Sequence, residues 1–144
     1  MTKQDLRLRL FRYRDLQAEA EQIHQALERV EARMGAPRAS QIDGMPRSHG
    51  YGSDPAFEII AQHIALENRY KAQLARLTAE MTWIEDTIEG LDPMERTLMR
   101  HRYLEGKTWE EVCVAIGYSW RQTHNIHARI LNKLVNQYDE GQGD

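Results

Sequence analysis

The side chains best suited to recognising a ligand through hydrogen bonds lie near the C-terminus of this 144-residue chain, between Ser119 and Lys133. The period of the apolar residues places Thr123, Ile126 and Ile130 on the buried face of a helix. The outward face at the start of that helix then carries Trp120, Arg121, Gln122, His124 and Asn125. Arginine can bind guanine O6 and N7, and asparagine or glutamine can bind adenine N6 and N7. The spacing therefore predicts a helix that reads base edges in the major groove of double-stranded DNA.

The distribution of charge agrees with this interpretation, although the formal net charge of the whole chain is −3. Residues 55–91 carry three basic and six acidic side chains, whereas 119–138 carry three basic side chains and no acidic one. It is the local field that meets phosphate. We expect Arg129 and Lys133, one and two turns beyond the base-reading end, to bind phosphate groups. Ser119, as the N-cap, would leave backbone N–H groups of the helix for another phosphate.

Sharp helix boundaries recur through the last third of the chain. Capping boxes are predicted at Asp92–Glu95, Thr108–Glu111 and Ser119–Gln122, and glycine stops at Gly106 and Gly117. A short helix, a three-residue turn and a longer helix form the plan of a helix-turn-helix. The expected core positions of the three helices are Leu98, Met99 and Tyr103, then Val112, Ala115 and Ile116, and finally Thr123, Ile126, Ile130 and Leu134.

The first two thirds of the chain contain two long amphipathic segments. Apolar residues alternate steps of three and four from Tyr13 to Met34 and from Tyr70 to Leu91, which predicts heptad stripes on helices 4–34 and 55–89. Such helices must pair with each other, with a second copy or with a partner. The predicted fold is all-α, with a long antiparallel, coiled-coil-like helical hairpin (1–91, loop 35–54). A tri-helical helix-turn-helix domain (92–138) and a flexible tail (139–144) follow.

Other classes of function find little support in the sequence. It contains no phosphate-binding glycine loop, nucleophile elbow or HExxH motif, so we predict no enzyme, no catalytic residue and no cofactor. His101, His124 and His127 are the only cluster to suggest zinc, and they lack cysteine or carboxylate partners at metal spacing, so no metal site is predicted. No apolar run approaches the roughly 20 residues that span a bilayer. The single cysteine, Cys113, fits a reducing cytoplasm and is expected to be buried.

The C-terminal third resembles region four of bacterial sigma factors, which recognises the −35 promoter element and contacts RNA polymerase. The resemblance lies in Leu91–Arg96, Arg102–Val112 and Ile116–Ser119, and it continues without a gap to Leu134. It implies that the helix beginning at Trp120 is the recognition helix. Trp120-Arg121 and His124-Asn125 depart from the residues common in sigma factors, so the −35 sequence preference is not carried over.

The order of segments along the whole chain resembles the ArpU/RinA-like regulators of bacteriophages. Residues 43–48 (DGMPRS) and 53–55 (SDP), lying between the two long helices, carry this resemblance outside the helix-turn-helix. It implies a transcriptional activator of phage late genes that acts in the cytoplasm of a bacterial host, with the host RNA polymerase as a candidate partner. Two alternatives stay open: a small terminase-like adaptor for DNA packaging, and a sigma-like module that binds polymerase without reading DNA. The heptad stripes also allow a homo-oligomer.

Overall fold

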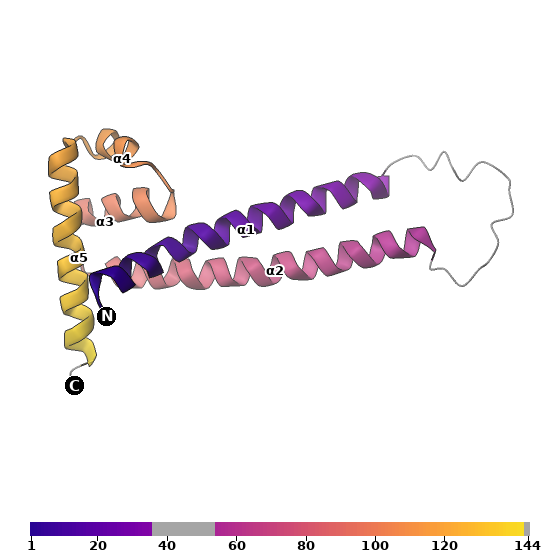
Figure 1. Ribbon diagram of the computed structural model, residues 1–144, viewed down its shortest axis with the longest axis horizontal. Helices are drawn as coiled ribbons and strands as arrows, with labels where there is room; N and C mark the ends of the chain where they lie inside the picture. The colour runs from indigo at the N-terminus through magenta and orange to yellow at the C-terminus, as the bar shows by residue number, and fades with distance from the viewer. Residues whose placement is uncertain (36–53, 143–144) are drawn as a thin grey trace, which may run out of the picture. The chain divides into compact units, whose positions relative to one another are not determined.

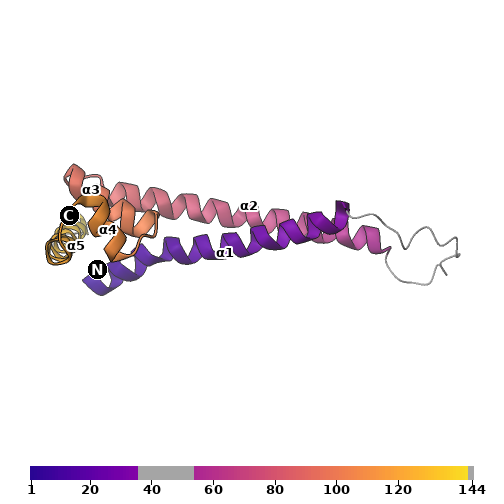
Figure 2. The same cartoon turned by 90° about the horizontal axis from the view of Figure 1, so that it is seen from above.

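The computed structural model describes residues 1–35 and 54–142, and every regular element in those ranges is a helix (Figure 1). The elements are α1 (Lys3–Gly35), α2 (Pro55–Ile88), α3 (Pro93–Met99), the π-helical turn η2 (Arg100–Leu104), α4 (Trp109–Ile116) and α5 (Trp120–Gln142). Helices α1 and α2 run antiparallel and side by side in both views (Figures 1 and 2). The all-α fold and the long helical pair are therefore confirmed. The Gly44–Arg47 segment lies outside the described residues.

The chain divides into two compact units, and their boundary differs from the one expected at residue 91. One unit, here the hairpin unit, is Ala18–Ala75; the other, the helix-turn-helix unit, combines Met1–Gln17 with Arg76–Asp144. The reason is that the first turns of α1 share a core with the C-terminal helices. Leu6 and Leu10 are buried in the same cluster as Ile130 and Leu131 of α5.

Within the hairpin unit, α1 presents its predicted stripe to α2. Ala20, Leu27 and Val30 are buried, as the heptad spacing requires. Polar pairs accompany them: Gln73 Nε2 donates a hydrogen bond of 3.0 Å to Glu19 Oε2. The α1–α2 contact in this unit is consequently part apolar and part polar.

The stripe predicted for α2 is only partly correct. Leu74 and Met81 were expected on the buried seam, but both are exposed, whereas Gln73, one residue before Leu74, is buried. In the helix-turn-helix unit, Glu80 takes the inward position next to Met81 and lies 3.5 Å from Arg9 Nε. Helix α2 thus has two stripes of apolar residues, offset by one position. The stripe that faces α1 also contains Gln73 and Glu80, whereas the stripe with Leu74 and Met81 is exposed.

The helix-turn-helix unit is built around one apolar cluster. It joins residues from all of its helices, namely Leu6, Leu10, Ile84, Ile88, Leu91, Leu98, Met99, Tyr103, Val112, Ile126, Ile130, Leu131 and Leu134. Most core positions predicted from the sequence are found there. Ala115 is an exception because it is exposed, and Cys113, expected to be buried, is half-buried. The short α4 buries only its Val112 side.

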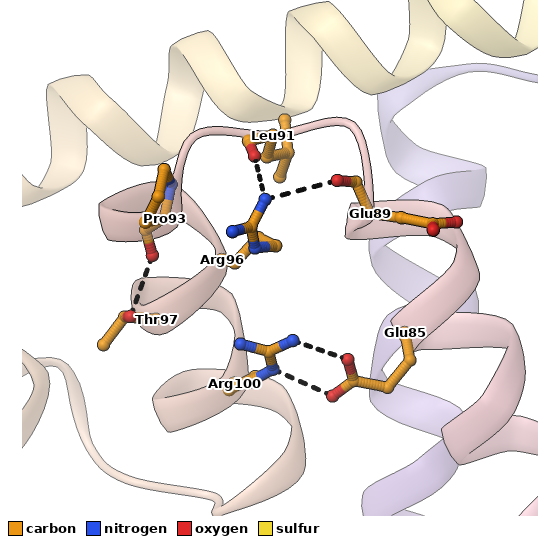
Figure 3. A network of polar contacts seen from close by, with 7 residues as sticks. All are labelled: Glu85, Glu89, Leu91, Pro93, Arg96, Thr97 and Arg100. Carbon is orange, nitrogen blue, oxygen red and sulfur yellow. Dashed lines mark hydrogen bonds and ion pairs between the residues drawn. The ribbon is translucent and has the colours of Figure 1, made fainter.

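A polar clamp fixes α3 to the end of α2 (Figure 3). Arg100 donates hydrogen bonds of 2.9 and 2.7 Å to the two carboxylate oxygens of Glu85. This paired contact lowers the pKa of Glu85, and the charge of Arg100 adds to the effect. Arg96 donates to the carbonyl oxygens of Leu91 and Glu89, which end the preceding turn. The corner between the two helices is thereby held by two arginines of α3 and η2.

Helix α5 is longer than the sequence indicated. It continues to Gln142, beyond the predicted boundary at 138, so residues 139–142 are helical rather than a tail without regular structure. The N-terminal amino group of Met1 lies 3.5 Å from Asp139 Oδ1. A helix that is already formed extends by one hydrogen bond per residue, so polar residues can prolong it.

Candidate nucleic-acid interface

The connection between α4 and α5 is a tight turn of three residues, Gly117 to Ser119, as predicted. Thr108 caps α4 by accepting a hydrogen bond from the Glu111 amide. Gly117 ends it with φ of 74°, a left-handed conformation that favours glycine, and its N–H donates to the Cys113 carbonyl. Ser119 then caps α5. These local signals set where the second helix begins.

Ser119 and Gln122 form a reciprocal capping box at the start of α5. The Gln122 amide donates to Ser119 Oγ, and the Ser119 amide donates to Gln122 Oε1, both at 3.2 Å. The carbonyl of the Gln122 side chain is thus committed to the cap. Only its NH2 group remains for an external acceptor, which weakens the expectation that Gln122 pairs with adenine through two hydrogen bonds.

The inward face of α5 is the one predicted. Thr123, Ile126, Ile130 and Leu134 are all buried, and the Thr123 hydroxyl donates a 2.8 Å hydrogen bond to the Ser119 carbonyl. This packing fixes the rotation of the helix. Side chains on the other side of α5 therefore point away from the core.

Three predicted site residues lie together on that outward face: Arg121, Asn125 and Arg129. All three are exposed, and within the described part of the chain their side chains make no hydrogen bond or ion pair. Their spacing of four residues aligns them along one side of α5, about 6 Å apart per step. They form a line of two cationic groups and one amide, which we call the α5 line.

His124 does not belong to the outward set. Its ring lies between two indoles, 4.6 Å from the ring centroid of Trp109 and 4.4 Å from that of Trp120. Its Nε2 is buried and has no hydrogen-bond partner among the residues that the structure describes. Trp120 covers His124 with one face and is still 54% exposed. The structure thus gives His124 a packing role and leaves Trp120 at the surface beside Arg121.

His127 is buried and anchors α5. The sequence had suggested it only as one of three histidines for a zinc site. The Nε2 of His127 lies 2.7 Å from the hydroxyl of Tyr103, a residue of η2. Burial lowers the pKa of His127 to about 4, and the nearby positive charges of Arg7, His124 and Arg102 lower it further. Burial likewise raises the pKa of Tyr103 to about 12. Both groups are therefore neutral at pH 7.

Lys133 is exposed along its stem but its ammonium group is already paired. It lies 3.0 Å from both carboxylate oxygens of Glu95, a buried residue of α3. Burial raises the pKa of Glu95, but the hydrogen bonds from Lys133 and from the Asp92 amide outweigh burial, and the pKa is lowered. The pair is an internal tie between α3 and α5. The predicted phosphate contact of Lys133 would have to compete with it.

The loop between η2 and α4 is held by two arginines. The guanidinium carbon of Arg102 lies 4.7 Å from the ring centroid of Trp109, and Arg102 Nη1 donates to the Lys107 carbonyl. Gly106 adopts φ of 71°, and the guanidinium of Arg14 occupies the space that a Cβ there would fill. The sequence predicted that the helix ends at Gly106, but it did not predict the contact with Arg14 of α1.

Comparisons with protein-family models, curated proteins and solved structures find no match to this chain. The resemblances to sigma region four and to the ArpU/RinA-like regulators therefore stay predictions. Among the described residues, no three histidine, cysteine or acidic side chains gather as metal ligands would. Nor does that part of the chain hold a helix with the length and apolar character needed to cross a membrane.

Proposed function

We propose that this protein is a sequence-specific regulator of transcription that binds duplex DNA through α5. The observation that carries the proposal is the α5 line: Arg121, Asn125 and Arg129 are exposed and uncommitted on a helix whose other face is locked in the core. Arg121 and Asn125 lie near the N-terminus of α5, the end that enters the major groove in a helix-turn-helix. The resemblance of the segment order to that of ArpU/RinA-like regulators, noted in the sequence, supports activation of late phage genes as the regulated process.

In this proposal each residue of the line has its own role. Arg121 reads guanine and Asn125 reads adenine, because their side chains offer the matching pairs of donors and acceptors. Arg129, one turn further on, binds phosphate and sets the register. Trp120, exposed beside Arg121, is placed to contact a sugar or a thymine methyl group. Lys133 is left out, since Glu95 holds its ammonium group.

The test begins with selection from a randomised duplex DNA library, followed by anisotropy titrations of the enriched sequence at two salt concentrations. Arg121→Ala should lower the preference for one base position by about tenfold to a hundredfold. Arg129→Ala should weaken all sequences alike and flatten the salt slope by about one unit. Arg69→Ala is the matched control, because it removes an exposed arginine from α2 instead.

The outcomes separate the alternatives. Unchanged urea midpoints for the three variants would show that lost binding is not lost folding, as expected for exposed side chains. If no sequence is enriched and nothing binds at low salt, the DNA-binding proposal fails. If binding occurs but Arg121→Ala alters neither affinity nor preference, another surface reads the DNA.

A further inference from the structure

Helix α2 carries an exposed apolar stripe on a different face from the side chains that meet α1. His63, Tyr70 and Gln73 of α2 meet side chains of α1. The stripe lies about 100° further round the helix, and its first members are Phe57, Ile60 and Ile64. Phe57 is 68% exposed and Ile64 is 53% exposed. Large apolar side chains in a continuous exposed line mark an interaction surface.

Two charged residues interrupt this stripe in the middle of the hairpin unit. Seven-residue spacing places Glu67, Lys71 and Leu74 in line after Ile64, and Leu74 is again exposed. Lys71, with 72% of its side chain exposed, lies 4.0 Å from Glu67 in a weak pair one turn apart, and Glu67 also lies 3.5 Å from the ring of His63. The stripe therefore reads apolar, acidic, basic, apolar from Ile64 to Leu74.

That order is complementary to itself when reversed. When two copies of the stripe run antiparallel with their centres at the level of residue 69, Ile64 lies opposite Leu74 and Glu67 lies opposite Lys71. The same spacing along α2 continues the pattern outward, with Phe57 opposite Met81 and Ile60 opposite Thr78. In a parallel pair, by contrast, Glu67 would face a second Glu67 and Lys71 a second Lys71. Like charges that face each other between packed helices repel, so the charges select the antiparallel arrangement.

We propose that α2 is the interface of a homodimer in which the α2 helices of two copies pack antiparallel through this stripe, with the two-fold axis at the level of residue 69 along the helix. Ile64 packs against Leu74 of the partner subunit, and Glu67 pairs with Lys71 of the partner subunit, each contact occurring twice. Two small exposed side chains lie beside the stripe and favour close approach of the helices: Ala61 and Ala75. The inference is independent of the DNA-binding proposal, because it concerns α2 alone.

The first experiment measures the dimer dissociation constant of the full chain by sedimentation equilibrium, without DNA. Lys71→Glu and Glu67→Lys should each raise it by at least about tenfold, because the symmetric interface contains the like-charge contact twice. An equimolar mixture of these two variants should recover dimers, since every lysine then faces a glutamate across the interface. Arg69→Glu is the matched control, an equal charge reversal on the opposite face of α2, and should leave the constant unchanged.

The mixture distinguishes an interface from an effect within one chain. Each single variant keeps two like charges one turn apart in its own helix, so recovery on mixing can come only from contact between copies. A protein that is monomeric at every concentration, as when another segment of its own chain covers the stripe, would refute the proposal. A dissociation constant that does not respond to Lys71→Glu would also refute it.

The orientation has a separate test in a Cys113→Ser background. A chain carrying Ile64→Cys and Leu74→Cys should form disulfide-linked dimers on mild oxidation. Within one helix these positions lie about 15 Å apart, too far to join. The control chain with Phe57→Cys and Leu74→Cys places its thiols about 10 Å out of register between copies and should not cross-link. Equal cross-linking of the two chains would overturn the proposed register.

Discussion

The buried His127 should make the helix-turn-helix unit sensitive to acid. Its imidazole is hydrogen-bonded to Tyr103 and packed beneath Trp109, 4.6 Å between ring centroids. Arg7 from α1 and Arg102 from η2 add positive charge nearby. A proton on His127 would place a further positive charge in this apolar setting, so the folded state resists protonation.

The magnitude follows from the shift of the pKa from 6.5 to about 4. At pH values between about 4 and 6.5, His127 is protonated in the unfolded chain and neutral in the folded chain. Stability is therefore fully present above about pH 7 and falls as the pH drops toward 4. Linkage gives a loss of about 1 kcal/mol at about pH 5.5 and about 2–3 kcal/mol at about pH 4.5, relative to neutral pH.

Urea unfolding at a series of pH values, followed by circular dichroism at one protein concentration, measures this loss. His127→Gln keeps an amide that can bond to Tyr103 but removes the titrating group. The variant should be less stable at neutral pH, yet its free energy of unfolding should fall with acid by about 2 kcal/mol less than that of the wild type. His24→Gln, a change at a half-buried histidine of the hairpin unit, is the control and should retain the wild-type dependence. Parallel pH curves for wild type and His127→Gln would refute the reasoning.

Two further substitutions test contacts within the helix-turn-helix unit. Gly106→Ala should cost about 1–3 kcal/mol, because alanine is strained at positive φ and its Cβ displaces Arg14; Gly90→Ala, which meets nothing closer than 3.7 Å, should be close to neutral by urea denaturation. Glu95→Gln should lower the free energy of unfolding at neutral pH by about 1–3 kcal/mol, because it removes the charge that holds Lys133. The loss should shrink in acid as the wild-type carboxylate protonates, and a loss that is constant with pH would contradict the pairing.

The boundaries of the C-terminal helices could be predicted from the sequence because they are set locally. The Asp92–Glu95 and Ser119–Gln122 capping boxes need only residues three positions apart, and both are formed. The left-handed Gly117 likewise needs no distant partner. Once these ends are fixed, the apolar period determines which face of α5 is buried, and with it the position of the α5 line.

The parts that the sequence did not reveal depend on contacts between distant residues. Lys133 looked like a free phosphate ligand because Glu95 lies 38 residues earlier in the chain. His124 was expected to face outward because of its position on the helix, but its ring packs between the indoles of Trp109 and Trp120. Leu74 was placed on the wrong seam for another reason: α2 has two apolar stripes one residue apart, and periodicity alone cannot say which one α1 covers.

The two proposals bear on each other through the amount of charge that one copy offers to DNA. Of the three basic residues on α5 before Asp139, Lys133 is neutralised by Glu95, which leaves Arg121 and Arg129. With Arg121 on a base and Arg129 on a phosphate, the salt slope from α5 would be about −1, whereas proteins that make roughly 6–10 phosphate contacts have far steeper slopes. One copy of α5 therefore supplies too little electrostatic attraction by itself. A dimer formed through α2 carries two copies of α5, which would double that contribution if both contacted one duplex. The Lys71→Glu variant, with α5 intact, should accordingly bind DNA with about half the salt slope of the wild type.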